Sequence, residues 1–331
     1  MKAALYERPG PAREVLSIAE LPTPEAGPGE VRVKVAWSAV NPSDVKSRAA
    51  VRSKTLPFPR IVPHSDGSGV IDRVGEGVDP ARLGERVWLW NAAWMRPFGT
   101  AAEYVALPAA QAVKLPESVD LEIGACLGIP ALTAYHAVVV DGGVEGQSVL
   151  VSGGAGAVGH YAIQIAKLRG ARQVVATVSG EEKAALARDA GADLVFNYKT
   201  EDWVAKCLET TDGVGLDRIV EVDAAANVKS DLSALRPEGR IVVYGSGAPE
   251  IAVPFGPSIL KNIRFSFFIV YNLSADDRAR AIADLTELLA GNRLEHNIAA
   301  RLPLARIAEA HELVEQGTAV GKVLLEIEPR A

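Results

Sequence analysis

The stretch Leu150–Lys167, "LVSGGAGAVGHYAIQIAK", packs glycines and alanines into a turn between an apolar run and a segment with helical periodicity. Gly154, Gly156 and Gly159 fit the spacing GxGxxG, which on its own is a weak signal. Here the strand-like "SVLVS" precedes the turn, and the helix-like "HYAIQIAKLRG" that follows it ends at Gly170. The context therefore predicts the strand, phosphate-binding turn and helix that begin a dinucleotide-binding unit.

Each glycine of this turn has an expected task. The first allows the tight bend, the second lets backbone N–H groups approach a pyrophosphate, and the third lets the helix pack closely on the strand. The helix N-terminus adds partial positive charge. We therefore expect the cofactor phosphates to lie against the backbone of Gly154, Ala155, Gly156, Ala157, Val158 and Gly159.

Strand-like runs alternate with helix-length segments around the turn, which predicts a parallel sheet with helices between its strands. The strand-like runs are Ser148–Val151, Gln173–Val178, Leu194–Phe196, Arg218–Val222, Arg240–Tyr244 and Ile263–Tyr271. A single helix is expected over "LEIGACLGIPALTAYHAVV", ahead of the first of them. Together these segments predict a dinucleotide-binding domain at residues 122–271.

The first third of the chain has a different pattern, with many prolines and glycines and short runs such as "EVRVKVAWSAV" that alternate apolar and polar residues. This pattern is typical of a small, barrel-like β domain. The last sixty residues predict two helices and a strand, too little to bury a core of their own. We therefore expect them to pack back on the β domain, giving a catalytic domain of residues 1–121 and 272–331.

Composition narrows the class of protein. A chain of 331 residues with 48% hydrophobic content can fill two cores, and a formal charge of −6 argues against nucleic acid or an anionic membrane as partner. Cys126 and Cys207 are the only cysteines, which excludes a disulfide framework and a four-cysteine zinc lobe. The start lacks an apolar run of signal-peptide length, so a cytoplasmic location is expected.

The end of the second strand of the sheet indicates which dinucleotide is bound. An acidic side chain there would bond both ribose hydroxyls of NAD, but this chain has Ser179 and Gly180, with Lys183 about one helical turn on. Small groups and a cation suit a 2′-phosphate, so NADPH is predicted. In the alternative, Lys183 is solvated and Glu181 or Glu182 reaches the ribose.

Several spaced motifs carry a family resemblance over essentially the whole chain. The glycine-rich stretch, together with "VNPSDVKSR", "GVIDRVGEGV", "GTAAEYV" and "LGIPALTAYHAV", resembles the medium-chain dehydrogenase/reductase superfamily, in its zinc-independent quinone oxidoreductase (zeta-crystallin-like) branch. The resemblance implies an α/β chain in which a GroES-like β-barrel domain accompanies a Rossmann domain with a doubly wound parallel sheet. It also implies an active site in the interdomain cleft.

Departures from the zinc alcohol dehydrogenases of that superfamily bear on metal binding. Asn41 stands where they place a zinc cysteine, and Ser65 stands where they place the histidine of a Gly-His-Glu motif; His64 is one position away. Amide and hydroxyl groups cannot replace thiolate and imidazole in a catalytic zinc site. No metal site is therefore predicted.

The resemblance implies the remaining site residues. Asn41 matches an asparagine near the nicotinamide, where its amide would donate to a developing oxyanion; an Asx-turn before Pro42 is the alternative. Asp44 and Lys46 lie in the same segment as catalytic candidates, with Lys46 either the proton donor or a solvated lysine, and solvent protonation is also open. The other cofactor contacts implied are Tyr198, Gly245, Ser246, Val270 and Lys322.

These residues predict an NADPH-dependent reductase that delivers hydride to a quinone or conjugated carbonyl without zinc. The alternatives are a reductase of enone or enal double bonds, a non-catalytic NADPH-binding structural or regulatory protein and, third, a zinc alcohol dehydrogenase. We expect a homodimer paired through the apolar sixth strand, unless the tail covers that edge. Trp88, Trp90, Trp94 and Phe98 form either core or an apolar wall for a flat ring.

Overall fold

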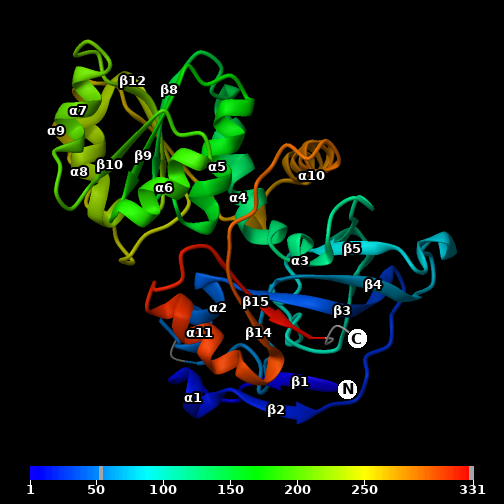
Figure 1. The fold of residues 1–331 in the computed structure, drawn as a ribbon. Coiled ribbons are helices and arrows are strands. Elements are labelled where there is room, and N and C mark those ends of the chain that lie inside the picture. The colour runs from blue at the N-terminus through cyan, green and yellow to red at the C-terminus, as the bar shows by residue number, and fades with distance from the viewer. Residues whose placement is uncertain (52–54, 328–331) are drawn as a thin grey trace. The chain divides into compact units, whose positions relative to one another are not determined.

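The computed structural model describes residues 1–51 and 55–327 (Figure 1). The chain divides into two compact units. The first unit combines Met1–Ile129 with Ile282–Ala331, and the second unit is the continuous segment Pro130–Ala281. In the described ranges, none of the helices has the length and apolar character needed to cross a membrane.

The first unit is built on β strands. Its strands are β1 (Lys2–Leu5), β2 (Ser17–Glu20), β3 (Glu30–Val40), β4 (Asp66–Val74), β5 (Arg86–Leu89), β6 (Tyr104–Pro108), β7 (Ala112–Lys114), β14 (Ile298–Pro303) and β15 (Lys322–Glu326). One sheet has the order β14-β15-β3-β4-β5-β7, with β6 also paired to β3, and β1 and β2 form a separate antiparallel pair. Its helices are α1 (Ala12–Val15), α2 (Pro42–Arg48), α3 (Leu121–Gly124) and α11 (Ile307–Glu315).

Strand β3 is the centre of this sheet. It is eleven residues long, and its Val31, Val33 and Val35 are at most 1% exposed, as their alternation with polar residues predicts. It pairs antiparallel with β4, β6 and β15. Because β15 comes from the tail, the end of the chain completes the sheet begun by its first third.

The second unit is a six-stranded parallel sheet with the order β10-β9-β8-β11-β12-β13. The strands are β8 (Ser148–Ser152), β9 (Gln173–Val178), β10 (Leu194–Asn197), β11 (Leu216–Glu221), β12 (Leu235–Val243) and β13 (Arg264–Phe267). The order reverses direction between β8 and β11. In open parallel sheets, this switch point, at the carboxyl ends of the strands, is where nucleotides bind.

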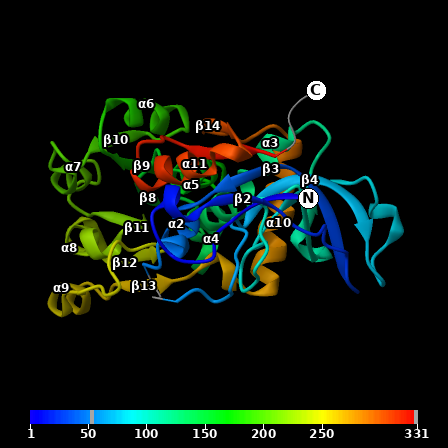
Figure 2. The same cartoon turned by 90° about the horizontal axis from the view of Figure 1, so that it is seen from below.

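Helices cover both faces of the parallel sheet. They are α4 (Leu132–Val139), α5 (Ala157–Leu168), α6 (Glu181–Asp189), α7 (Trp203–Glu209), α8 (Ala224–Ala234) and α9 (Phe255–Leu260). The division between the two units falls within the next helix, α10 (Ala275–Ala290). Figure 1 shows α4, α5 and α6 on one face and α7, α8 and α9 on the other. Figure 2 shows α7, α8 and α9 in a row along one side of the unit. This doubly wound arrangement is the one predicted from the alternating pattern.

Two expected elements are shorter or more broken than predicted. The long helix expected from Leu121 is instead α3, a π-helical turn at Leu127–Ala131 and α4. Pro130 lies inside that turn, where it lacks the N–H that a continuous α-helix needs. The run expected as the sixth strand from Ile263 to Tyr271 forms only the four-residue β13, since a 3₁₀ turn begins at Val270.

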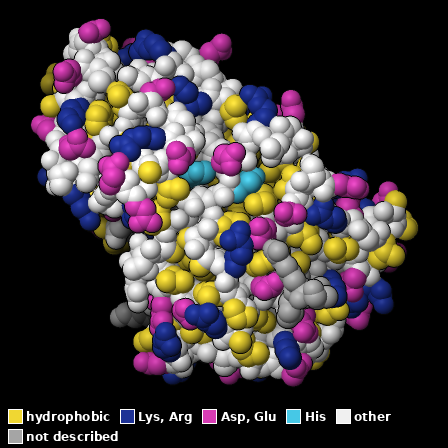
Figure 3. Space-filling view, in the orientation of Figure 1, with side chains coloured by type: hydrophobic (Ala, Val, Ile, Leu, Met, Phe, Trp, Pro, Cys, Tyr) yellow, Lys and Arg dark blue, Asp and Glu magenta, His cyan; other side chains and the backbone are white. Residues whose placement is uncertain are grey.

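The surface carries charges of both signs. On the face drawn in Figure 3, Lys and Arg side chains lie among Asp and Glu side chains, and no large area carries a single sign. A nucleic-acid groove needs a continuous basic stripe. The drawn face offers none.

Candidate active site

The glycine loop (residues 153–159) joins β8 to α5. The sharp turn is made by Gly153, whose φ of +69° lies in the left-handed region. The sequence assigned that turn to Gly154, but a Cβ on Gly154 would lie 2.7 Å from the Cβ of Ala176 on β9. Gly154 is therefore needed for close packing against the neighbouring strand, and the residue before it makes the bend.

The last glycine of the loop is needed for a backbone contact. A Cβ on Gly159 would lie 2.3 Å from the carbonyl oxygen of Gly153, so only glycine lets α5 approach the turn. Gly156 is different, because its Cβ would meet only that same oxygen, at 3.3 Å. Its open side lies at the N-terminus of α5, where no side chain caps the helix. The loop therefore fits the pyrophosphate of a dinucleotide.

The residues predicted to select the cofactor lie at the ends of two adjacent strands. Ser179 follows β9, and the backbone N–H of Tyr198, after β10, donates to the carbonyl of Val178 at 3.1 Å. Tyr198 is 51% exposed, and a Cβ on Gly180 would meet nothing within 4 Å. This edge is therefore open to a ligand. Lys183 is half-buried on the first turn of α6.

One of the acidic residues of α6 is already engaged. Glu181 forms an ion pair with Arg188 at 2.7 Å, while Glu182 is exposed. An exposed ion pair of this kind is weak, at about 0–1 kcal/mol. It nevertheless draws Glu181 toward Arg188 on its own helix, which favours Lys183 over Glu181 as the group that meets the ribose.

The other predicted contacts of the second unit follow β12 and β13. Gly245 lies just after β12, and Val222 follows β11. A Cβ on Gly245 would lie 2.2 Å from the carbonyl oxygen of Val222, so only glycine lets these two segments pack so closely. The Ser246 hydroxyl donates to the Ala248 carbonyl at 2.7 Å within its own turn. Val270 is 5% exposed. Together with the glycine loop, Gly245 and Ser246 lie at the carboxyl edge of the parallel sheet.

In the first unit, three adjacent strands bring distant residues together. Asn41 directly follows β3, Asp66 is the first residue of β4, and Lys322 is the first residue of β15. Both β4 and β15 run antiparallel to β3, so their first residues lie beside the end of β3. Pairing across the whole sheet thus places an amide, a carboxylate and an ammonium group side by side.

These side chains form one buried polar cluster, which we define as Asn41, Asp44, Asp66 and Lys322. The Asn41 Nδ2 donates to Asp66 Oδ2 at 2.9 Å, and Lys322 Nζ donates to Asn41 Oδ1 and, at 3.1 Å, to Asp66 Oδ2. Asn41, Asp66 and Lys322 are only 2%, 0% and 3% exposed. An ion pair so thoroughly buried is retained only when both charges are satisfied.

Asp44 is held against this cluster by the start of α2. Its Oδ2 accepts the backbone N–H of Asn41 at 2.8 Å. Burial raises the pKa of Asp44 to about 7; the negative charge of Asp66 adds to the rise, whereas the bond from Asn41 and the charge of Lys322 oppose it. A carboxyl group tuned to this range can carry a proton near neutral pH. Lys46 is half-buried on the same helix.

The positions at which the zinc dehydrogenases hold their metal do not fit a zinc ion here. The oxygens of Asn41 and Asp66 already accept the Lys322 ammonium, whose charge repels a divalent cation. The His64 ring bonds to Ser38 Oγ at 2.8 Å and to His311 Nε2 at 2.9 Å. Among residues 1–51 and 55–327, no group of three or more His, Cys, Asp or Glu could hold a metal ion.

The sequence did not single out Asp66, which directly follows Ser65 in the stretch "PHSDGSG". A carboxylate at the first residue of an apolar strand is the only local signal. Of the predicted aromatic stretch, Trp88 is fully buried on β5 and belongs to the core, whereas Trp94 and Phe98 are 36% and 46% exposed.

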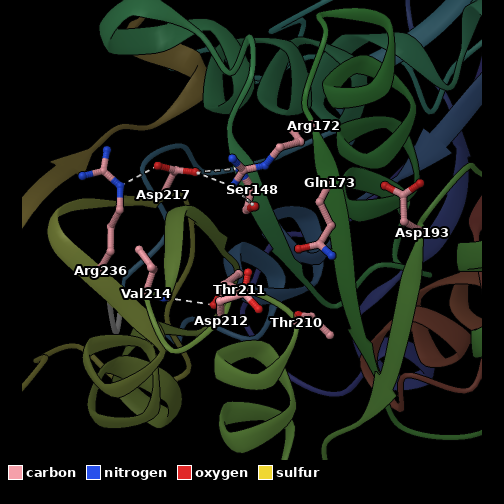
Figure 4. A pocket seen from close by; sticks show the side chains of 11 residues that line it. Ser148, Arg172, Gln173, Asp193, Thr210, Thr211, Asp212, Val214, Asp217 and Arg236 are labelled. Atoms are coloured by element: carbon pink, nitrogen blue, oxygen red, sulfur yellow. Dashed lines mark hydrogen bonds and ion pairs between the residues drawn. The ribbon is translucent and has the colours of Figure 1, made fainter.

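A cavity of about 750 Å³ lies in the second unit, at the amino ends of the parallel strands. Figure 4 shows the polar side chains that line it. Asp217 accepts the backbone N–H of Ser148 at 2.7 Å and is bonded to Arg236. The glycine loop lies at the opposite, carboxyl edge, so this cavity is separate from the candidate cofactor site.

Comparison with known proteins defines the class. Residues 27–117 match the model described as alcohol dehydrogenase GroES-like domain, and residues 157–287 match the model described as zinc-binding dehydrogenase. The chain is 32% identical to the human quinone oxidoreductase, over 97% of this chain and 96% of the relative. It therefore belongs to the medium-chain dehydrogenase/reductase superfamily, and its two units are a GroES-like domain and a Rossmann domain.

Other relatives show how varied the family is. The 2-haloacrylate reductase of a Burkholderia species is 28% identical over 98% of each chain. The crystal structure of an NAD-dependent alcohol dehydrogenase has a TM-score of 0.90 at 32% identity, covering 99% of this chain and 100% of that one. A mycobacterial protein solved in complex with NADPH has a TM-score of 0.88 at 28% identity, with the same coverage. The protein is thus an NAD(P)-dependent oxidoreductase.

Substitutions in the glycine loop separate ligand binding from folding. Gly156→Ala is expected to leave the free energy of unfolding nearly unchanged but to weaken NADPH binding about tenfold or more, since the methyl group would face the phosphates. Gly159→Ala should lower the free energy of unfolding by about 1–3 kcal/mol, because its methyl group meets backbone. Urea denaturation and fluorescence titration with NADPH measure the two effects; unchanged NADPH affinity in Gly156→Ala would contradict the assignment of the loop.

Stability should depend on the protonation of Asp44. Its folded-state pKa of about 7 lies above the ordinary value of 3.8 for an aspartate side chain. The stabilisation from its neutral form is therefore complete below about pH 4 and is lost as the pH rises to 7, by at most about 4 kcal/mol. Asp44→Asn should lack this slope in urea denaturation from pH 4 to 8. Equal slopes in the wild type and the variant would show that Asp44 is ionised in the folded protein.

Proposed function

We propose that this protein is an NADPH-dependent reductase of quinones and conjugated carbonyls that works without zinc. The observation that supports the proposal is the buried ion pair of Lys322 and Asp66 against Asn41, the residue that the resemblance places at the position of a zinc cysteine. NADPH, when bound, supplies a hydride. The protein then has to position the acceptor, stabilise developing negative charge and provide a proton.

The residues of the first unit suit these tasks. Asn41 is proposed to donate from its amide to the oxygen that becomes negative, a role worth roughly 3–4 kcal/mol in other oxyanion sites. Asp44 is proposed to supply the proton, which its raised pKa lets it carry. Lys46 remains a second proton donor candidate, half-buried on the same helix. Lys322, which the resemblance implies as a cofactor contact, is proposed to use for that contact the third N–H of its ammonium group, beyond its bonds to Asn41 and Asp66.

NADPH is proposed over NADH because of the edge of the second unit. Ser179 and Gly180 leave open space there, and Lys183 follows on the first turn of α6. The ion pair of Glu181 with Arg188 removes one of the carboxylates that would favour NAD. The mycobacterial relative solved with NADPH supports this choice.

A second candidate reaction is reduction of a carbon–carbon double bond conjugated to a carbonyl or carboxylate. The full-length similarity to a 2-haloacrylate reductase favours it. The same residues would serve, since hydride addition to the β carbon also places negative charge on an oxygen and needs a proton. Exposed Trp94 and Phe98 are proposed to form an apolar wall for either substrate.

The activity is tested by following cofactor oxidation with a panel of quinones, enals and enones. We expect NADPH to be oxidised with quinones at least tenfold faster than NADH, at equal concentrations. Cofactor carrying deuterium at the transferred position distinguishes the two reactions, because deuterium stays on carbon after alkene reduction and is lost to solvent after quinone reduction. Tight NADPH binding with no turnover of any acceptor would indicate a non-catalytic binding protein.

The cofactor preference has a matched test. In Ser179→Asp, a carboxylate would face the 2′-phosphate, so NADPH affinity should fall by about tenfold or more relative to NADH. Ser233→Asp makes the same charge change at an exposed position on α8 and should alter neither affinity. An unchanged ratio of the two affinities in Ser179→Asp would refute the proposed 2′-phosphate site.

We also propose a cytoplasmic homodimer joined at β13. This strand is the last of the parallel sheet, and Phe267 on it is 60% exposed. On the adjoining α9, Phe255, Ile259 and Leu260 are 77%, 56% and 84% exposed, so a large apolar surface borders an unpaired strand. Sedimentation velocity is expected to report twice the mass of one chain. The two unpaired, buried cysteines suit a reducing compartment.

A further inference from the structure

We propose that Asp66 is a positioning residue that, with Lys322, fixes the orientation of the Asn41 amide toward the substrate. The inference rests on the proposed role of Asn41 in hydride transfer. It assigns a function to the one charged member of the buried polar cluster that neither the motifs nor the resemblance identified. All three residues belong to the first unit, so the arrangement is internal to that unit.

Charge decides which way the amide points. The Asn41 carbonyl faces the Lys322 ammonium, and its NH₂ group faces Asp66 Oδ2 at 2.9 Å. A flipped amide would place N–H groups against the ammonium and an oxygen against the carboxylate, which is repulsive at both ends. At 2% exposure, water cannot replace the lost bonds. Only one of the two orientations is therefore stable.

Asp66 is itself held firmly enough to act as a reference point. Its second carboxylate oxygen, Oδ1, accepts the backbone N–H of Ile129 at 2.8 Å. A Cβ on Gly128 would lie 2.3 Å from that same oxygen, so the glycine is what allows this approach. The backbone carbonyl oxygen of Asp66 accepts a hydrogen bond from the Thr100 hydroxyl at 2.6 Å. Side chain and backbone of Asp66 are thus anchored to different segments.

The pairing also affects the strength of the amide as a donor. An ammonium ion bonded to the carbonyl oxygen draws electron density from the amide, which makes its N–H groups better donors. Asp66 keeps that ammonium in a buried position that a lone cation would avoid. Asp66 therefore acts through Asn41 and Lys322 and needs no contact with the substrate.

The test is a double-mutant cycle with NADPH and a quinone, here 1,4-naphthoquinone. In Asp66→Asn, the amide keeps one acceptor oxygen and turns an NH₂ group toward Ile129 or toward Lys322, so the bonds to Asn41 are lost or weakened. We expect kcat to fall about 10- to 100-fold, with the KM for quinone within about threefold of wild type. Asn41→Ala should lose a similar factor.

The proposal is decided by whether the losses in kcat of the two single variants multiply in the double variant. If Asp66 acts through Asn41, the double variant Asn41→Ala/Asp66→Asn is no slower than Asn41→Ala alone. If the two losses multiply, or if folded Asp66→Asn keeps the wild-type kcat, the proposal is wrong. Asp72→Asn is the matched control, since Asp72 lies on the same strand and pairs with Arg32 at 2.8 Å, away from the cluster. Its kcat should be unchanged.

A measurement on the wild-type protein covers the case in which Asp66→Asn does not fold. With ¹⁵N-asparagine labelling, the Asn41 side-chain amide, assigned by its loss in Asn41→Asp, should exchange with solvent at least a hundredfold more slowly than exposed amides. Rapid exchange would overturn the proposal. This readout is independent of turnover: an inactive wild type would refute the proposed function alone, while a freely exchanging amide would refute only the positioning role.

Discussion

The first unit depends on a buried ion pair, Asp66 with Lys322, in which each charge needs the other as its partner. Asp66 and Lys322 are almost fully buried, at 3.1 Å, and removal of one partner of such a pair costs about 3–5 kcal/mol. The pair forms only if β15, from the tail, lies beside β3 with β4 on its other side. The catalytic asparagine candidate is therefore oriented by the same contact that joins the two ends of the chain.

The second unit depends on close backbone contacts rather than on charge. Gly159 packs against the carbonyl of Gly153, and Gly154 packs against Ala176, so the helix α5 can begin directly over the turn. These contacts leave Gly156 and the uncapped start of α5 facing open space at the switch point of the sheet. We propose that the second unit binds the cofactor phosphates at this loop and that the buried polar cluster of the first unit serves hydride and proton transfer.

Local patterns in the sequence predicted most of the fold, because strand alternation and helix periodicity depend on neighbouring residues. The glycine loop, β3 and all six strands of the parallel sheet follow from these patterns, although the sixth strand is shorter than predicted. The pattern did not reveal that Gly153 makes the turn, since GxGxxG counts from the next residue. Nor did it reveal the roles of Asp66 and of Lys322 beside Asn41, because they meet only when strands separated by more than 250 residues pair. Pro130 is the local signal for the break in the helix expected from Leu121, since proline lacks the N–H that a continuous helix needs.

The claim that ties these features together is that an ammonium ion, and not a metal, lies beside Asn41 while hydride is transferred. It is tested most directly by measuring the zinc content of the purified protein and its NADPH–quinone activity before and after dialysis against a strong chelator. We expect far less than one zinc per chain and the same kcat after dialysis. One zinc per chain, whose removal abolishes activity and whose return restores it, would contradict the account.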